Sequence, residues 1–322
     1  MRILELKELS AELLAQIPSL PALDGDPPMG IGQIRAARRS GLPYSDYYAV
    51  YAVEDGRLIG RVETSWFPFT GPLGRQTVVG ICDVLVRPTD GRKGGATALL
   101  AEVHRREAAL GREWSFLWTH RTWGAHRLYE RLGYADVYSP PLAIRAVPRR
   151  DGPRRPAPES WSTARRTEAP VLEGVLAEGT RGRMGFVPRS PGSFSARFRL
   201  GWRSPRNHRL LRSGSRVVGY AHVVPVPPRS TMVTEVVLTS ADHAEPMLDA
   251  LEAEAAGRWL MFETTTFVTD QAPLLTRRGY EIHLSTHRVM MAKRLVEAPA
   301  GLIDPAAVGR DPAFSNHRGD MF

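Results

Sequence analysis

The stretch that decides the fold is Asp83-Val84-Leu85-Val86-Arg87-Pro88-Thr89-Asp90-Gly91-Arg92-Lys93-Gly94-Gly95-Ala96-Thr97-Ala98-Leu99-Leu100. Its apolar beginning predicts a β-strand that ends at Val86, and Pro88 stops further strand pairing. A glycine-rich turn follows and leads directly into a helix predicted over 96–110, with Gly111 just beyond its end. The stretch therefore predicts a strand, a tight turn and a helix in immediate succession.

The turn has the features of an anion-binding site. Its main-chain N–H groups are expected to point at one spot, where the N-terminus of the helix adds about half a positive charge. Glycines let the backbone approach a diphosphate closely, and basic side chains add charge. The residues predicted to bind the anion are Arg92, Lys93, Gly94, Gly95, Ala96 and Thr97.

A second stretch follows at 125–134, Ala-His-Arg-Leu-Tyr-Glu-Arg-Leu-Gly-Tyr, and predicts a short helix over 124–132 that Gly133 closes. Upstream, 47–53 and 58–65 predict the two strands of a hairpin around a turn at 54–56. Further strands are expected at 76–86 and 114–118. The first half therefore alternates strands with helices.

The second half repeats this order of elements. Arg57-Leu58-Ile59-Gly60 is similar to Arg216-Val217-Val218-Gly219, and Leu132-Gly133-Tyr134 is similar to Arg278-Gly279-Tyr280. Such short matches carry weight because they fall at the same places in the same succession of elements. The last strand of the second half is expected over 282–291.

The length of 322 residues exceeds that of one core of usual size, so two domains are expected. We predict an N-terminal domain at 1–147, a linker rich in Pro and Arg at 148–158, a C-terminal domain at 159–296 and a tail at 297–322.

Two motifs resemble those of the GNAT acetyltransferase superfamily. Val86, Pro88, Gly94 and Ala96 match the acetyl-CoA loop, and the stretch from 125 to 134 matches the closing helix of the family. Gly91 departs from the pattern, because the family has Arg or Gln there. The resemblance implies an α/β (α+β) fold of two tandem GNAT-like domains, each with a mixed, mostly antiparallel central sheet flanked by helices.

The resemblance also implies a reaction, in which an amine attacks the acetyl thioester of acetyl-CoA directly. Tyr129 matches the tyrosine that protonates the departing thiolate in the family, and Leu85 and Val86 match the strand that pairs with the pantetheine amides. The attacking amine must lose a proton, and Asp83 is our first candidate for the base.

Alternatives to these roles stay open. Glu63 and His120 are further candidates for the base, and a solvated or structural role is the alternative for each. Cys82 is expected to be a small apolar strand residue rather than a nucleophile. Trp66, Phe67, Phe69, Trp118 and Trp123 are expected either to line the acceptor site or to belong to the core.

The second half lacks the residues that form the predicted site of the first half. The segment 238–246 has no glycine and places Asp242 and Glu245 near the corresponding anion site, and Leu275 stands where the first half has Tyr129. We therefore interpret the C-terminal domain as degenerate, with Glu235 falling where Asp83 does.

Composition narrows the remaining choices. No apolar run could span a membrane, and one cysteine gives neither disulfides nor a thiolate metal site, so we expect a cytoplasmic, metal-free enzyme. The net charge of +9 suits an anionic ligand such as acetyl-CoA. The acceptor is expected to be a small-molecule amine, with no nucleic acid or membrane partner, and the protein a monomer or homodimer. The alternatives are an idle coenzyme A-binding scaffold and a protein N-terminal acetyltransferase.

Overall fold

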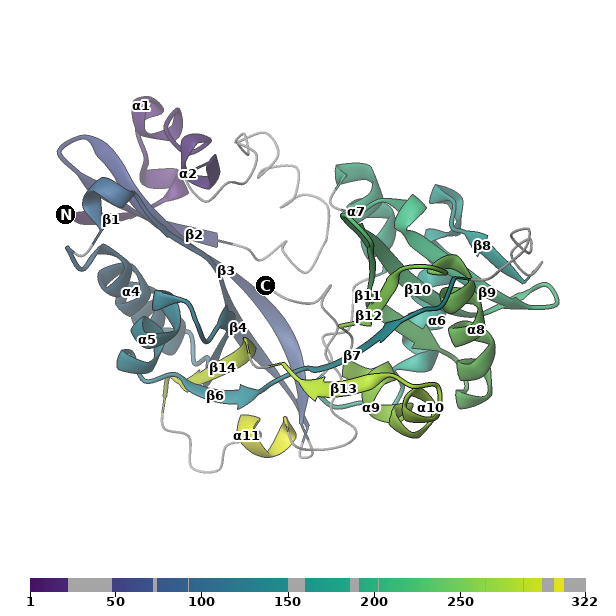
Figure 1. The fold of residues 1–322 in the computed structure, drawn as a ribbon. Coiled ribbons are helices and arrows are strands. Elements are labelled where there is room, and N and C mark those ends of the chain that lie inside the picture. Colours follow the sequence, from purple (N-terminus) through teal and green to yellow (C-terminus); the bar gives the residue numbers. More distant parts are fainter. Residues whose placement is uncertain are drawn as a thin grey trace. The chain divides into compact units, whose positions relative to one another are not determined.

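The computed structural model describes residues 1–22, 48–71, 74–91, 93–149, 160–185, 191–201, 203–263, 265–285, 287–296 and 304–309. The chain divides into two compact units (Figure 1), of which the first contains Met1–Val137 and His287–Ala306 and the second contains Tyr138–Thr286. Each unit is built on one seven-stranded sheet flanked by helices. The predicted fold class, two mixed and mostly antiparallel sheets with helices, is confirmed.

The sheet of the first unit has the strand order β1-β2-β3-β4-β5-β14-β6. Only β4 and β5 are parallel among the pairs whose register is described. The strands are β1 (Arg2–Glu5), β2 (Tyr48–Glu54), β3 (Arg57–Gly71), β4 (Gly74–Val86), β5 (Trp114–His120), β6 (Ala135–Tyr138) and β14 (Arg288–Arg294). The helices are η1 (Leu6–Glu8), α1 (Ala11–Leu14), α2 (Ser19–Ala22), η3 (Pro88–Asp90), α4 (Gly95–Ala109) and α5 (Gly124–Arg131).

Two apolar clusters pack the first unit. Leu99, Leu100 and Val103 of α4 lie at a helical spacing and join Tyr129 of α5 in one cluster with inward residues of the sheet. Leu13, Ile17 and Leu20 of the N-terminal segment form the other cluster with residues of β2 and β3. The helical stripe predicted from the sequence is therefore what holds α4, and the turn before it, on the sheet.

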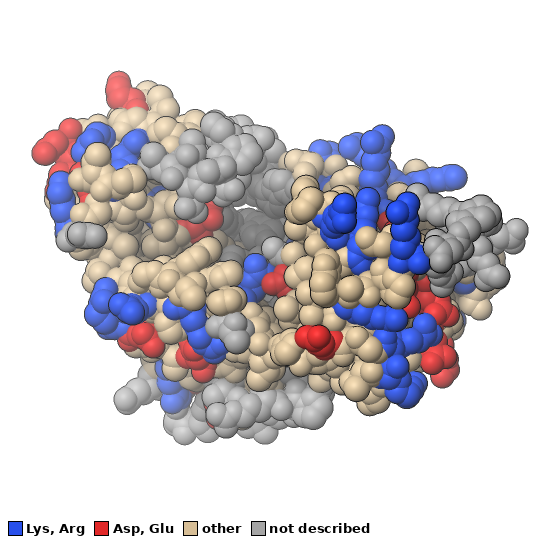
Figure 2. All heavy atoms as spheres, in the orientation of Figure 1, with Lys and Arg blue, Asp and Glu red and all other residues tan. Residues whose placement is uncertain are grey.

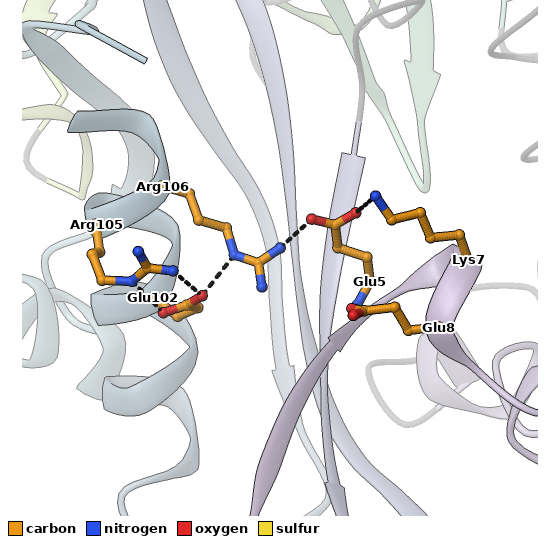
Figure 3. A network of polar contacts seen from close by, with 6 residues as sticks. All are labelled: Glu5, Lys7, Glu8, Glu102, Arg105 and Arg106. Carbon is orange, nitrogen blue, oxygen red and sulfur yellow. Dashed lines mark hydrogen bonds and ion pairs between the residues drawn. The ribbon is translucent and has the colours of Figure 1, made fainter. Parts of the chain in front are cut away.

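A network of charges ties α4 to the N-terminal segment (Figure 3). Glu102 accepts hydrogen bonds from Arg105 and from Arg106, both at 2.7 Å from Oε1. Arg106 also donates to Glu5, which pairs with Lys7 at 3.1 Å. The two hydrogen bonds, from Arg105 first, lower the pKa of Glu102 to about 2, so this carboxylate stays charged across the physiological range.

The sheet of the second unit has the order β13-β7-β12-β11-β10-β9-β8. Its strands are β7 (Pro141–Ala146), β8 (Trp161–Thr163), β9 (His208–Ser213), β10 (Arg216–Val226), β11 (Ser230–Leu238), β12 (Trp259–Phe262) and β13 (Glu281–Leu284). The helices are η4 (Arg166–Glu168), α6 (Ala169–Gly179), α7 (Ser193–Leu200), η5 (Pro205–Asn207), η6 (Ala241–His243), α8 (Ala244–Glu254), α9 (Thr265–Asp270) and α10 (Ala272–Arg277). Here β11 and β12 are the parallel pair.

The two sheets exchange a strand, which the sequence did not predict. β7 follows β6 along the chain but pairs with β12 and β13 of the second sheet. β14 pairs with β5 of the first sheet along seven residues, from Arg288 opposite His120 to Arg294 opposite Trp114. The structural division therefore differs from the expected boundary after 147, and the strand expected over 282–291 is two strands in different sheets. An alternating pattern marks a strand but does not specify its partner.

Several expectations fall on residues outside the described part. Of the predicted linker only Pro148 and Arg149 are described, and of the tail only 304–309, which holds the short helix α11 (Pro305–Val308). Within the described ranges, no helix is long and apolar enough to cross a membrane. In that same part of the chain, no three His, Cys, Asp or Glu side chains gather as a metal ion would require.

Much of the basic charge is neutralised locally. Figure 2 shows Lys and Arg side chains gathered on the visible face of the second unit. Several arginines of the second unit pair with carboxylates, among them Arg209 with Glu254 and Arg212 with Glu168. Arg216 pairs with Glu178 at 2.7 Å. This distribution fits a solvated basic surface, because paired guanidinium groups are less available to an anionic polymer.

Candidate active site

The parallel strands β4 and β5 diverge toward their carboxyl ends. They pair only from Val79 opposite Ser115 to Ile81 opposite Leu117. Beyond that point β4 stays paired with β3 as far as Val86, and β5 stays paired with β14 as far as His120. The sheet therefore opens between the two strands at the edge where the predicted anion site lies.

The register shows which main-chain groups face this opening. Arg87 N–H donates to the carbonyl of Ile59 on β3 at 2.8 Å. Because the direction of main-chain groups alternates along a strand, Leu85 also faces β3, while Val84 and Val86 face the opening. Of the two residues that the resemblance implies for the pantetheine, Val86 therefore faces the opening and Leu85 faces β3. The main chain of Val84 also faces the opening.

A bulge separates this end of β4 from the rest. The register between β3 and β4 shifts between Arg61 and Glu63. Asp83 lies in the bulge with φ of +33°, a value that residues with a side chain seldom adopt. The bulge re-aims the end of β4, which is what brings Val84 and Val86 to the opening.

The turn after β4 leaves the first N–H groups of α4 unobstructed. Gly94 precedes the helix with φ of +82°, and a Cβ there would have no atom within 4 Å. Gly95 begins the helix, with a site for a Cβ 3.7 Å from Val86. The N–H groups of Gly95, Ala96 and Thr97 lack partners within the helix, as they do at any helix N-terminus. These are the groups proposed to bind a diphosphate.

Asp90 holds the turn, and the sequence did not single it out. Its carboxylate is 2% exposed and accepts hydrogen bonds from Arg57 at 3.1 Å and from Lys93 at 3.3 Å. Burial opposes ionisation, but hydrogen bonds from Thr89 and Lys93 and the charge of Arg57 outweigh it, so the pKa of Asp90 lies below its usual value. Lys93 is therefore partly committed to Asp90, and Arg92 lies outside the described residues.

Tyr129, the predicted proton donor, lies on α5 with most of its side chain buried. The residue is 7% exposed, and its ring lies 5.9 Å from that of Tyr134 in an edge-to-face contact. Among the described residues, none forms a hydrogen bond with its hydroxyl, which is also not among the buried atoms without a partner. Burial raises the pKa of Tyr129 to about 12. The phenol therefore keeps its proton at neutral pH and has it free to donate.

A buried polar network supports the base of α5. Lys293 Nζ, which can only donate, lies 3.2 Å from His104 Nδ1, so the other ring nitrogen of His104 carries the proton. That nitrogen lies 2.8 Å from the hydroxyl of Tyr134, which lies 2.6 Å from Ser115 Oγ. Burial, and then the charge of Lys293, lower the pKa of His104 to about 3. The exchanged strand β14 thus supplies one member of the network beneath Tyr129.

Asp83 and Glu63 share one buried cation. Arg61 is fully buried, with Nη2 2.9 Å from Asp83 Oδ2 and Nη1 2.6 Å from Glu63 Oε1. The Asp83 side chain is 45% exposed, whereas that of Glu63 is 5% exposed. Of these two carboxylates, that of Asp83 is therefore the more accessible to solvent. Nothing in the sequence indicates that Arg61 is buried.

The other candidate residues take different positions. Burial, and then the charges of Glu63 and Asp83, raise the pKa of the Cys82 thiol well above its usual range, which agrees with the structural interpretation of that residue. Phe67 and Phe69 are buried and pack on Phe116, with ring centroids at 6.4 and 4.9 Å, so both belong to the core. Trp123 is 58% exposed and stacks on His120 at 4.6 Å.

The second unit repeats the opening without the same groups. β11 and β12 pair from Ser230 opposite Trp259 to Val233 opposite Phe262 and no further, and β10 and β11 carry a register shift at His222. The turn after β11 contains η6 with Asp242, and Leu275 is fully buried in the core. The opening between parallel strands is therefore present twice, but His243 rather than glycine precedes α8, and Leu275 is the counterpart of Tyr129 in the sequence.

Comparisons with known proteins agree with this geometry. Residues 26–137 match the family model of the acetyltransferase (GNAT) domain. No curated protein sequence matches the chain. The diverging strands, the bulge and the turn before α4 thus define the class as a protein of the GNAT acetyltransferase fold. Residues 26–137 are therefore similar in sequence to the GNAT acetyltransferase domain, as the sequence motifs predicted.

Solved structures similar to the whole chain share the fold. A conserved protein from Enterococcus faecalis described as a probable N-acyltransferase has a TM-score of 0.66 at 16% identity, over 91% of this chain and 72% of that one. A GCN5-related N-acetyltransferase from Anabaena variabilis has a TM-score of 0.64 at 15% identity, over 92% of this chain and 73% of that one. A tandem GNAT protein from the clavulanic acid biosynthesis pathway has a TM-score of 0.54 at 14% identity, over 92% and 99%. The tandem arrangement expected from the internal repeat agrees with these folds.

Proposed function

We propose that the protein is an acetyl-CoA-dependent N-acetyltransferase that acts on the primary amine of a small molecule. The observation that carries the proposal is the opening between β4 and β5, which ends at a helix N-terminus preceded by a glycine with left-handed backbone. Tyr129, whose hydroxyl has no hydrogen-bond partner among the described residues, packs in the same apolar cluster as Val84 and Val86. Backbone donors, apolar strand residues and a proton source are what a thioester of coenzyme A requires.

The residues of the first unit fit acetyl-CoA in a definite order. The N–H groups of Gly95, Ala96 and Thr97 would hold the diphosphate, assisted by the helix dipole. The outward groups of Val84 and Val86 would pair with the amides of the pantetheine. Bound acetyl-CoA supplies an activated acetyl group whose leaving group is a thiolate.

The transfer requires two proton movements that these side chains can perform. Asp83 takes a proton from the ammonium form of the acceptor, with Arg61 holding one of its two oxygens and leaving the other to accept. The free amine attacks the thioester carbonyl, a C–N bond forms and the C–S bond breaks. Tyr129 gives its proton to the departing sulfur, and the proton that the amine nitrogen loses restores the phenol through solvent.

A screen of primary amines for release of free thiol from acetyl-CoA tests the proposal. Once an acceptor is found, Tyr129→Phe should lower turnover by about 10²-fold with little change in affinity for acetyl-CoA, because it removes only a positioned acid. Full turnover in Tyr129→Phe would assign the residue to packing. Absence of thiol release with every amine, in a protein that binds acetyl-CoA, would reject the transferase.

A further inference from the structure

The second unit contains a cavity that the proposed acetyl transfer does not use. Its volume is about 270 Å³, and it is bounded by the end of β11, the end of α6 and by α9. It lies beside the part of β11 that continues beyond the pairing with β12, which ends at Val233 opposite Phe262. The lining residues used below are Gly179, Arg181, Arg183, Val236, Leu238 and Asp270.

Main-chain groups of β11 face this cavity. Thr239 N–H donates to Val218 of β10 at 2.9 Å, so by alternation Val236 and Leu238 face away from β10. Within the described residues, nothing is hydrogen-bonded to the outward N–H and carbonyl of Val236 or to the N–H of Leu238. Main-chain groups in protein interiors are nearly always paired, so these three groups require water or a ligand.

The spacing of these groups specifies what they can bind. In a parallel ladder, one residue donates its N–H to a carbonyl on the neighbouring strand and accepts from the N–H two residues further on. Val236 C=O and Leu238 N–H have that relation. The opening therefore accepts one residue of an extended chain, flanked by two amides and running parallel to β11.

Gly179 brings the end of α6 close to the carboxyl end of β11 beside the cavity. A Cβ at Gly179 would lie 2.5 Å from the carbonyl oxygen of Leu238, so only glycine lets α6 come this close. Arg181 follows two residues later and is therefore near the end of β11, where the carboxyl end of a parallel occupant would lie.

The charged side chains beside the carboxyl end of β11 favour an anion. The carboxylates of the lining are paired, Asp270 with Arg183 and Glu178 with Arg216. Arg181 is exposed and has no ion pair among the described residues. A terminal carboxylate of the occupant would be its counterpart, because a guanidinium binds a carboxylate through two parallel hydrogen bonds.

The same cavity is unsuited to coenzyme A. Its volume lies below the range of about 300–1,000 Å³ typical of sites for drug-sized ligands. Asp242 and Glu245 lie in the turn and helix after β11, where a diphosphate would need backbone donors without like charge. The opening of the second unit therefore has main-chain groups that can bind amides but lacks a site for the diphosphate of a nucleotide.

We propose that the second unit binds a small N-acylated dipeptide with a free terminal carboxylate. Its central residue pairs with Val236 and Leu238 as a short parallel strand, and its carboxylate binds Arg181. The small volume of the cavity favours a free small molecule over the terminus of a longer chain.

The full-length protein tests this with matched ligands in calorimetric titrations. N-acetyl-alanyl-alanine should bind once per chain, and its C-terminal amide about tenfold more weakly, since it lacks the charge-assisted bonds. Arg181→Gln should weaken the carboxylate about tenfold and leave the amide unchanged. Arg166→Gln removes an exposed arginine of the same unit outside the cavity and should change neither. An N-acetylated tetrapeptide should bind more weakly than the dipeptide.

Four further outcomes test the proposal. Leu238→Pro removes the outward N–H without removing a ladder bond, so it should weaken carboxylate and amide equally if the variant keeps its melting temperature. Absence of dipeptide binding to the wild type, or an equal effect of Arg181→Gln on carboxylate and amide, would overturn the proposal. Displacement of the dipeptide by acetyl-CoA would overturn it too, by showing that the opening is a coenzyme site.

Discussion

Gly94 offers a direct test of the turn before α4, because a side chain there meets no steric obstacle. Its φ is +82°, and a Cβ would have no neighbour within 4 Å. Substitution therefore costs only the backbone strain of a left-handed residue, about 1–2 kcal/mol. Gly111, just beyond the other end of α4, is a matched control, with φ of +73° and the same absence of neighbours.

We predict that Gly94→Ala and Gly111→Ala lower the free energy of unfolding equally, by about 1–2 kcal/mol. Gly94→Glu should lower the free energy of unfolding slightly less than Gly94→Ala, because a carboxylate at a helix N-terminus stabilises the helix by about 0.3–1 kcal/mol. The variants should then separate in the presence of acetyl-CoA. A ligand at 100 times its Kd stabilises the folded state by about 2.7 kcal/mol, and Gly94→Glu should lose this gain by repelling the diphosphate.

The assay is chemical denaturation of each variant with and without acetyl-CoA. Gly111→Glu carries the same side chain at the far end of the helix and should keep the full stabilisation. If Gly94→Glu is stabilised as strongly as Gly111→Glu, the diphosphate does not lie at the N-terminus of α4, and the assignment of the turn is wrong.

Three further predictions concern the buried polar groups. The pKa of His104 is lowered from 6.5 to about 3, so the folded state resists protonation of this residue. The contribution of His104 to the free energy of unfolding should therefore not change with pH above pH 6.5. Between pH 6.5 and pH 3 the free energy of unfolding should fall by up to about 5 kcal/mol. His104→Gln should flatten that slope in acid denaturation, and Lys293→Met should raise the His104 pKa in an NMR titration; an unchanged pKa would disprove the coupling of the two. Arg61→Met should destabilise by about 3–5 kcal/mol in denaturant, since it leaves Glu63 and Asp83 without their shared cation, and a loss below 1 kcal/mol would contradict the buried pairing. Asp90→Ala should weaken binding of acetyl-CoA in calorimetry by releasing Arg57 and Lys93, and unchanged affinity would show that the turn holds its shape without this anchor.

The sequence predicted the local elements around the candidate site well. The helix expected over 96–110 is α4, and the helix expected over 124–132 is α5. Apolar spacing and glycine positions determine such elements within a short window, so they are visible without tertiary information. β3 runs to Gly71, beyond the predicted end at 65, because Phe67 and Phe69 continue the inward alternation of the strand.

Features that depend on distant contacts were not predictable in the same way. The exchange of β7 and β14 rests on which sheet offers a free edge, and the alternating pattern of a strand says nothing of its partner. Arg61 and Asp90 look like surface charges in the sequence, and only the register and the turn show that both are buried. Whether the main chain of Leu85 or that of Val84 faces the opening depends on the single extra residue that the bulge inserts into β4.

The central claim is that acetyl-CoA binds in the opening between β4 and β5 with its sulfur at Tyr129. A crystal structure of the protein grown with acetyl-CoA measures this directly. We predict one molecule per chain, with its pantetheine paired to Val84 and Val86 and its sulfur within about 3.5 Å of the Tyr129 hydroxyl. Coenzyme bound between β11 and β12, or a Tyr129 hydroxyl turned away from the sulfur, would contradict the account.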